Sequence, residues 1–297
     1  MEAIGYDEVF YGGVCVLAAK NGGAYPYGNS LLVRGSDSTL IVDPSRALGW
    51  APPEVDVVVV SHAHEDHLAG LRLFDTPVFA HAADIAAVRS RDVLMAGYGL
   101  PPEARDAFAH TVEHGFCIED RPDAEAFEDG HRFDLGGRTA TIVHLPGHTA
   151  GHCGILIEPD GFFFVADIDL TSFGPFYGDV GSSLSDFEAS IDRCAAIEAK
   201  WYGTFHQKGV IEGAAEFRSR LTAYRGVIGA RDQRLLELLA EPRSIAQVAE
   251  QRIVYRQHID EPYVATVERH TVQCHVARLV DLGYVVEETP GMYRVRR

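Results

Sequence analysis

The chain has 297 residues, enough for one large domain or for one domain with a small second one. Its 43 acidic residues outnumber its 26 Lys and Arg, and the formal net charge is −17. This charge argues against non-specific binding to nucleic acid or to an anionic membrane. No apolar run approaches the ~20 residues that a membrane-spanning helix needs. With nucleic-acid binding, membrane binding and membrane-spanning helices disfavoured, the composition is typical of an acidic globular protein.

The five cysteines form no C-x-x-C pair, and their scattered, odd-numbered set is typical of reduced thiols. The first residues contain neither a basic segment nor an apolar one, so we expect no signal peptide. Together these observations predict a cytoplasmic protein.

The first elements in chain order are strands at residues 9–19 and 30–42. The segment 21–29 between them is rich in Gly and Asn, which predicts a loop. The second strand ends in Asp43-Pro44. This acid could orient a neighbouring side chain, or it could form an ordinary Asp-Pro turn.

The most informative stretch is Ser61-His62-Ala63-His64-Glu65-Asp66-His67. It follows a β-branched run at residues 55–60, which predicts a buried strand, and precedes a leucine-rich segment at 68–74, which suits an amphipathic helix. His62 and His64 are two residues apart, so in extended chain both rings point the same way and could share one metal ion. Asp66 and His67 come where the chain turns into the helix and could hold a second ion.

This motif resembles the metal-binding motif of the metallo-β-lactamase superfamily of hydrolases. A second segment, Pro146-Gly147-His148-Thr149-Ala150-Gly151-His152, is similar to the P-G-H-T-x-G-H loop of glyoxalase II-like members. The resemblance covers roughly residues 9–210. It implies an α/β fold, an αββα sandwich, with metals in a cleft at one edge.

The resemblance also implies a ligand set. His148 would join His62 and His64 on the first metal, and Asp167, at the end of an apolar strand, would bridge both metals. His206 would complete the second metal with Asp66 and His67. Asp43 would orient a metal-binding histidine from behind. His144 and His152 are rivals for His148, and Asp169 is the rival for Asp167. Gln207 departs from the Gly that usually follows the last histidine.

The chemistry expected from this set is hydrolysis by two divalent metal ions, zinc with iron or manganese as alternatives. A metal-bridging hydroxide would attack a small ester, thioester or lactone, with Asp66 and Asp167 as the catalytic carboxylates. Aromatic residues of two loops are the candidates for the substrate pocket: Tyr25, Tyr27, Phe173, Phe176 and Tyr177. Leu170 stands where quorum-quenching lactonases carry a Tyr, which weakens the lactone alternative.

Residues 226–297 are expected to form a second domain after the catalytic domain of residues 1–225. Helices are predicted at 231–239, 245–251 and 264–282, and a hairpin at 284–295. This order resembles a small winged-helix-like α+β domain. Winged helices often bind DNA, but residues 231–297 hold ten basic and ten acidic residues, whereas a nucleic-acid footprint should be basic. We expect a packing, lid or homodimerisation role instead.

Two other functions of the same fold are alternatives. A metal-dependent nuclease fits the winged-helix resemblance, but the acidic charge opposes it. A mononuclear-iron enzyme of the persulfide-dioxygenase type would not need the full second-metal set, so the presence of Asp66, His67 and His206 counts against it.

Overall fold

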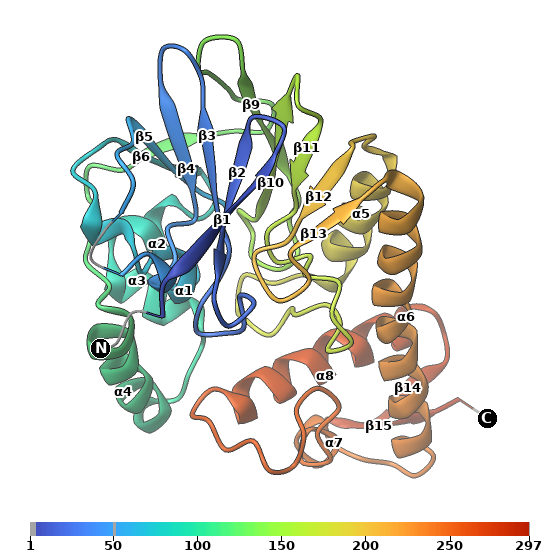
Figure 1. Ribbon diagram of the computed structural model, residues 1–297. Coiled ribbons are helices and arrows are strands. Elements are labelled where there is room, and N and C mark those ends of the chain that lie inside the picture. Colours follow the sequence, from blue (N-terminus) through green and yellow to red (C-terminus); the bar gives the residue numbers. More distant parts are fainter. Residues whose placement is uncertain (1–3, 50–51, 297) are drawn as a thin grey trace.

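The computed structural model describes residues 4–49 and 52–296 and has a layered α/β architecture (Figure 1). Two β-sheets lie face to face, and helices cover the outer face of each. This is the predicted αββα sandwich. Residues 1–3, 50–51 and 297 lie outside the description.

The first sheet has its strands in sequence order from β1 to β7. The strands are β1 (Tyr6–Tyr11), β2 (Val14–Ala19), β3 (Ser30–Arg34), β4 (Thr39–Val42), β5 (Val57–Val60), β6 (Val78–His81) and β7 (Glu125–Phe127). The two long strands predicted at 9–19 and 30–42 are each split by a turn. Tyr11 pairs with Val14 across Gly12, whose φ of 66° permits the tight reversal, and Arg34 pairs with Thr39.

The second sheet has the order β13-β12-β11-β10-β9-β8. Its strands are β8 (Arg132–Asp134), β9 (Thr139–His144), β10 (Cys153–Glu158), β11 (Phe162–Phe164), β12 (Trp201–Gly203) and β13 (Val210–Glu212). The hairpin predicted around residues 158–160 is confirmed, because β10 and β11 pair in antiparallel register there.

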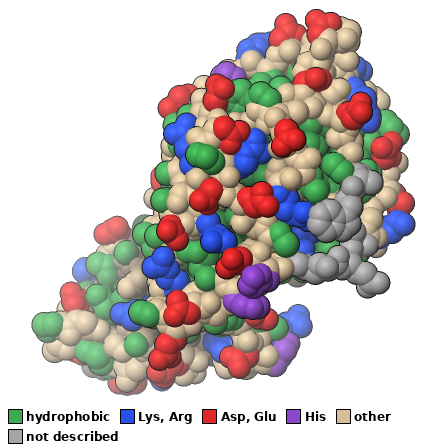
Figure 2. Space-filling view, turned by 90° about the vertical axis from the view of Figure 1, so that its left-hand side faces the viewer, with side chains coloured by type: hydrophobic (Ala, Val, Ile, Leu, Met, Phe, Trp, Pro, Cys, Tyr) green, Lys and Arg blue, Asp and Glu red, His purple; other side chains and the backbone are tan. Residues whose placement is uncertain are grey.

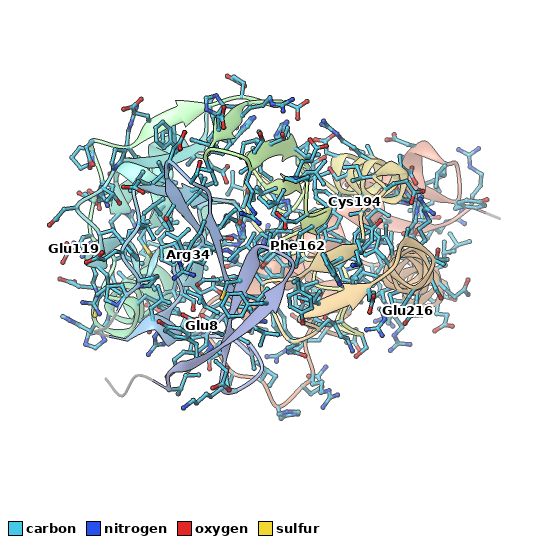
Figure 3. All side chains as sticks on the ribbon, turned by 45° about the horizontal axis from the view of Figure 1, so that its top comes forward. Glu8, Arg34, Glu119, Phe162, Cys194 and Glu216 are labelled. Carbon is cyan, nitrogen blue, oxygen red and sulfur yellow. The ribbon has the colours of Figure 1, made fainter. Side chains whose placement is uncertain are left out.

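The central strands β3, β4, β5, β10 and β11 are buried on both faces, which explains why they are nearly continuous apolar runs rather than alternating ones. In β11, Phe162 and Phe164 point between the sheets while Phe163 packs beneath the helices of the second sheet. In β3, Leu32 points outward and its two neighbours point inward. Figure 3 shows Phe162 inside the sandwich and Glu119 and Glu216 at opposite outer sides. The core is therefore three apolar layers separated by two sheets.

The helices of the first outer layer are short. They are α1 (Glu65–Leu68), α2 (Ile85–Arg89), α3 (Arg91–Gly97) and α4 (Pro102–His110), with the π-helical turn η3 (Thr111–Phe116) and the 3₁₀ turns η1 (Arg46–Leu48) and η2 (Leu71–Leu73). The amphipathic helix predicted at residues 68–74 does not form as one helix, because α1 ends at Leu68 and a separate 3₁₀ turn covers Leu71–Leu73. Between them lies Gly70, whose amide donates to the carbonyl oxygen of Pro44.

The second outer layer contains α5 (Leu184–Ala196) and the 25-residue α6 (Ala214–Leu238). The predicted domain boundary at residues 225/226 falls within α6, so this one helix packs on the second sheet and also reaches the C-terminal elements. Figure 1 shows α6 running between the two regions. The helix predicted at 231–239 is thus the end of a longer helix.

The C-terminal elements follow the predicted order. They are α7 (Ile245–Ala249), α8 (Val264–Asp281) and the hairpin of β14 (Val285–Thr289) and β15 (Met292–Val295). Ser244 and Gln247 form a capping box at the start of α7, and Gly283, at φ 76°, follows the end of α8. The helices and hairpin are confirmed, while the winged-helix assignment stays a prediction.

The surface agrees with the charge analysis. Acidic and basic side chains are interspersed over the described residues drawn in Figure 2, and no continuous basic area covers this face. Among the residues that the structure describes, no helix combines the length and apolarity needed to cross a bilayer.

Candidate metal centre

The histidine-rich motif begins at the C-terminal end of β5, an inner strand of the first sheet. The backbone there is fixed by Asp43, which follows the neighbouring strand β4. One Asp43 carboxylate oxygen accepts the Ser61 amide at 2.7 Å, and the other lies 2.9 Å from His67 Nδ1. All three residues are fully buried. Asp43 thus contacts both the motif's backbone and the His67 ring, and its orienting role stays a prediction.

The seven expected ligands lie together in two adjoining groups. In each group the potential donor atoms lie within 4.8 Å of one another: His62, His64, His148 and Asp167 form the first group, and Asp66, His67 and His206 the second. The later residues arrive from loops after β9, β11 and β12, at the same edge of the sandwich. Four segments far apart in sequence therefore meet at one point.

Asp167 lies between the two groups. Its Oδ1 is 3.2 Å from His67 Nε2 of the second group, and its Oδ2 is 3.4 Å from His148 Nε2 of the first. A carboxylate in this position can contact two cations at once.

In each of the five candidate-ligand histidines, the ring nitrogen that points away from the cluster, here called the outer nitrogen, contacts a partner. The partners are Ser61 Oγ for His62, Asp179 for His64, Asp43 for His67, the Phe176 carbonyl oxygen for His148 and the Gly23 carbonyl oxygen for His206. A carbonyl or carboxylate acceptor places the ring proton on the outer nitrogen. The inner nitrogen is then free to act as an electron-pair donor.

The charges of the metal-free site are strongly coupled. Burial lowers the pKa of His64 and of His206, but Asp179 raises the first and Asp167 and Asp66 raise the second, each to about 9. Burial also lowers the pKa of His67, yet nearby carboxylates bring it well above its ordinary value. His62 behaves oppositely, because burial and the neighbouring imidazoles hold its pKa well below the usual range.

Three buried atoms of this cluster have no hydrogen bond of acceptable geometry among the described residues: Asp66 Oδ2, His67 Nε2 and Asp167 Oδ1. Unpaired buried carboxylate and imidazole atoms are costly unless something satisfies them. Divalent cations satisfy both atom types, and mixed imidazole and carboxylate donors suit zinc, iron or manganese. The residues present therefore fit two such ions.

The rival ligands have other contacts. His152 is fully buried, but its Nδ1 lies 2.9 Å from the Leu145 carbonyl oxygen and its Nε2 accepts the Asp167 amide. It holds the backbone of Asp167 in place. His144 stacks on His81 at 3.9 Å between ring centroids, and its Nε2 lies 2.8 Å from the Ala150 carbonyl oxygen. Asp169 lines the cavity, and burial raises its pKa to about 6.

The cluster opens into a cavity of about 280 Å³. Tyr25, Phe173 and Phe176 line it, as the sequence indicated. The other two predicted pocket residues lie elsewhere. Tyr27 packs under Arg46, and Tyr177 is 1% exposed with its hydroxyl 2.8 Å from His275 Nε2. Tyr177 therefore supports the pocket loop from behind.

Several cavity residues were missed by the sequence analysis. Glu65, within the motif itself, accepts hydrogen bonds from the hydroxyls of Tyr25 and Tyr98. Asp169 was considered only as a rival ligand, and the others are Tyr98, Phe108, Asp179, Tyr224, Tyr255, Tyr263 and Val267. The last three come from the C-terminal elements, and nothing in their local sequence indicated contact with a site some 190 residues earlier. Glu65 could have been suspected, because it lies between two motif residues.

Comparison with proteins of known sequence gives relatives over part of the chain. An acyl-coenzyme A thioesterase of Gallus gallus is 28% identical over 192 residues, which cover 56% of this chain and 65% of the relative. A hydroxyacylglutathione hydrolase of Aeromonas salmonicida is 24% identical over 175 residues, covering 56% of this chain and 55% of the relative. The chain thus matches between half and two thirds of the length of these relatives.

Solved structures match more of the chain. A metallo-beta-lactamase family protein of Thermus thermophilus superposes with a TM-score of 0.70 at 22% identity, over 96% of this chain and 99% of that one. A beta-lactamase domain protein of Burkholderia ambifaria gives 0.70 at 18% identity, over 98% and 94%. At these identities the likeness concerns the fold. The family model of the metallo-beta-lactamase superfamily matches residues 25–206, which include all seven clustered side chains, and the chain belongs to that superfamily.

Proposed function

We propose that this protein is a dinuclear metal-dependent hydrolase of a small ester, thioester or lactone. The observation that carries the proposal is the position of Asp167 between two groups of buried donor atoms, with its Oδ1 3.2 Å from His67 Nε2 but without a hydrogen bond of acceptable geometry. The names of two relatives, a thioesterase and a hydroxyacylglutathione hydrolase, support acyl transfer to water.

His62, His64, His148 and Asp167 would hold one ion, and Asp66, His67, His206 and Asp167 the other. Zinc is the expected metal, and iron or manganese would suit the same donors. When bound, two such ions supply a water of lowered pKa and polarise the carbonyl oxygen of the substrate. The overall reaction adds water across the acyl C–O or C–S bond and gives a carboxylic acid with an alcohol or thiol.

The chain's own residues hold the candidate ligands in position for this chemistry. The outer hydrogen bonds of the histidines fix their rings and tautomers, so that little reorganisation is needed when ligands or substrate bind. The Asp167 backbone is held by His152, and the Asp66 carboxylate lies 3.0 Å from His206 Nε2. The cavity of about 280 Å³ favours a small molecule over a polymer.

Residues 226–297 are proposed to be a winged-helix-like domain with a packing or lid role, attached to a catalytic domain of residues 1–225. The contacts of the α8 segment with the cavity support this role, because Tyr263 and Val267 line the cavity wall. The balanced charge of this region argues against a nucleic-acid partner.

The proposal is tested by assaying phenyl acetate and a small acyl thioester with zinc-, iron- and manganese-loaded protein, with metal-free protein and with Asp167→Asn. We expect turnover only with metal, and a fall of more than about 100-fold in Asp167→Asn, since even outer-shell changes can cost that much. Asp75→Asn, a change at an exposed carboxylate, is the matched control and should keep full activity. Equal turnover by the metal-free protein or by Asp167→Asn would refute the proposal.

A further inference from the structure

One wall of the cavity is a continuous row of aromatic rings that starts beside His64, and we call it the aromatic arc: Tyr98, Phe108, Tyr263, Tyr255 and Phe173. Neighbouring centroids lie 5.1, 5.5, 6.0 and 5.5 Å apart in that order. The arc begins beside α3, crosses the C-terminal segment before and at the start of α8, and ends in the loop after β11. All five residues line the cavity.

The C-terminal contribution is held firmly. Glu268 of α8 is 1% exposed, and its carboxylate accepts the backbone amides of Ile253, Val254 and Tyr255. A buried carboxylate with several amide donors fixes a loop strongly. Tyr255 is therefore presented to the cavity by a rigid loop.

Apart from the candidate-ligand histidines and the tyrosine hydroxyls, the polar part of the cavity lining is acidic. Besides the candidate ligands Asp66 and Asp167, the carboxylates of Glu65, Asp169 and Asp179 line it. Among the described residues, no Lys or Arg does. Asp66 and Asp167 would contact the ions, so Glu65, Asp169 and Asp179 are the acidic side chains left to face a substrate.

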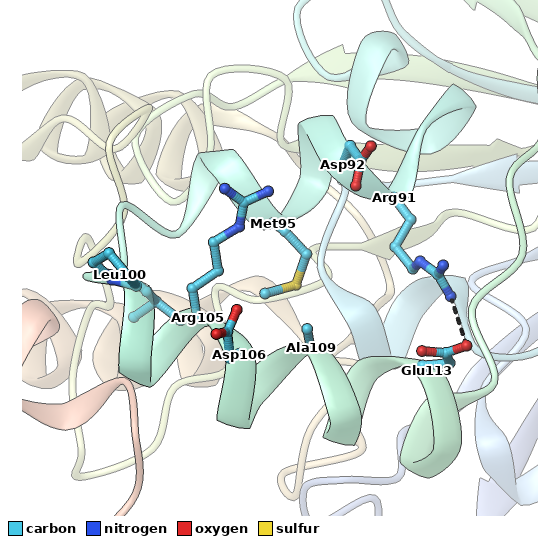
Figure 4. Close-up of a pocket in the computed structure, with 9 residues that line it drawn as sticks. Arg91, Asp92, Met95, Leu100, Arg105, Asp106, Ala109 and Glu113 are labelled. Atoms are coloured by element: carbon cyan, nitrogen blue, oxygen red, sulfur yellow. Dashed lines mark ion pairs between the residues drawn. The ribbon is translucent and has the colours of Figure 1, made fainter.

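Three arginines on helices that contribute to the cavity lie outside its lining. The buried Arg231 lies behind the arc and donates to the carbonyl oxygens of Phe173 and Pro175 and to the Tyr177 hydroxyl. Arg91 and Arg105 line a separate hollow between α3 and α4, where Arg91 pairs with Glu113 at 3.7 Å (Figure 4). An anionic substrate entering the cavity would therefore meet carboxylates and aromatic faces without a Lys or Arg from the described part of the chain.

Aromatic faces favour cations and apolar groups, and carboxylates at close range favour cations and oppose anions. We infer that the site takes substrates whose group beyond the scissile bond is either neutral and apolar or a cation with an apolar surface. Substrates that carry an anion in that group are rejected. Tyr255 and Tyr263 determine this selectivity. The inference rests on the proposed function and narrows its substrate class. It predicts a substrate unlike glutathione or coenzyme A thioesters, which carry carboxylates or phosphates.

Three isosteric substrates test the selectivity: phenyl acetates with a 4-trimethylammoniomethyl, a 4-neopentyl or a 4-sulfomethyl group. The methylene insulates the ester from the charge, and each kcat/KM is divided by the rate of hydroxide hydrolysis of the same ester. We expect the cation to equal or exceed the neutral ester, and the anion to fall at least about tenfold below it. An anionic ester hydrolysed as well as the neutral one would overturn the inference while leaving the hydrolase proposal intact.

The role of the arc is tested with Tyr255→Leu and Tyr263→Leu, which keep apolar bulk but remove the aromatic face. Each variant should lower the ratio of kcat/KM for the cationic ester to kcat/KM for the neutral ester. If the tyrosine had a merely structural role, kcat/KM would fall equally for the two esters. Tyr284→Leu, at an exposed tyrosine outside the cavity lining, is the control and should keep the wild-type ratio. An unchanged ratio in both arc variants would overturn their assignment.

A binding measurement separates the two proposals. Choline and 3,3-dimethylbutan-1-ol, which differ in charge but not in shape, are titrated into the zinc-loaded protein by calorimetry. Tighter binding of choline by about 2- to 30-fold, reduced in Tyr255→Leu, supports the inference even if no tested ester is hydrolysed. Equal or weaker binding of choline would count against it even if hydrolysis is found.

Discussion

Asp179 Oδ2 lies 2.6 Å from His64 Nε2, and both side chains are about nine-tenths buried. This carboxylate comes 115 residues after the histidine, from the loop between β11 and α5. The same loop supplies the Phe176 carbonyl oxygen to His148 Nδ1. One loop thus contacts two candidate ligands of the first metal.

Replacement of Asp179 by Asn should weaken metal binding. The amide cannot stabilise His64 as the carboxylate does, and outer-shell changes of this kind cost about 10- to 100-fold in metal affinity or activity. The measurement is the Kd for zinc, by competition with a chromogenic chelator, together with kcat/KM. Asp75→Asn should bind zinc like the wild type. A wild-type Kd for Asp179→Asn would show that the contact does not orient the ligand.

Replacement of Tyr177 by Phe should destabilise the loop from behind. The Tyr177 hydroxyl contacts His275 Nε2 at 2.8 Å and accepts from Arg231 at 3.0 Å, and His275 Nδ1 lies 2.6 Å from Asp232. Loss of the hydroxyl leaves buried partners unpaired, which costs about 1–3 kcal/mol of unfolding free energy. Urea unfolding measures the change.

Tyr284→Phe is the matched control for that change, because Tyr284 is 57% exposed. It should unfold within about 0.5 kcal/mol of the wild type. Equal unfolding free energies for the wild type and Tyr177→Phe would mean that the buried network does not stabilise the loop.

Metal binding should release protons and strengthen as the pH rises toward 9. In the metal-free protein the pKa values of His64 and His206 are raised to about 9, so both rings are charged at neutral pH, whereas a ligand must be neutral. Calorimetry at pH 7 in buffers of different ionisation enthalpy measures the released protons. Zinc binding without proton release would contradict these charge states.

The raised pKa values of His64 and His206 also predict how the stability of the metal-free protein depends on pH. A histidine whose folded pKa lies above its unfolded value of ~6.5 stabilises the fold fully below pH ~6.5 and loses this contribution as the pH rises to about 9. The rise in Tm on adding zinc should therefore be larger at pH 8.5 than at pH 6.5. Thermal unfolding with and without zinc measures it, and a larger rise at pH 6.5 would be the contrary result.

The layer between the sheets should be the most sensitive part of the core. Phe162 is fully buried there, and its ring lies 5.8 Å from that of Tyr11 across the sheets. Phe162→Ala should cost about 3–5 kcal/mol of unfolding free energy. Phe10→Ala, at a residue that is 59% exposed, is the control and should cost far less. Similar losses in both variants would contradict this account of the packing.

The strands and the candidate ligands were predictable because their signals are local. Val57–Val60 is a β-branched run that ends at the motif, and His148, Asp167 and His206 each follow a short apolar stretch. The length of α1 was not predictable in this way. Leucines at 68, 71 and 73 suit a helix, but Gly70 turns the chain toward Pro44, a tertiary contact that overrides the pattern.

The pocket was harder to predict because its walls come from distant segments. Tyr177 and Phe176 are adjacent in an aromatic loop, yet one faces α8 and the other the cavity. Tyr255 and Tyr263 reach the cavity because the segment between α7 and α8 lies against it. Side-chain direction in a loop depends on such packing, which neither composition nor spacing encodes.

The central claim is that two groups of side chains hold two ions, and metal content per chain tests it most directly. Elemental analysis of protein purified with zinc, iron and manganese supplied should give about two ions for the wild type and about one for His206→Ala, since His206 belongs to the second group only. One ion or fewer in the wild type, or a content unchanged by His206→Ala, would contradict the dinuclear centre.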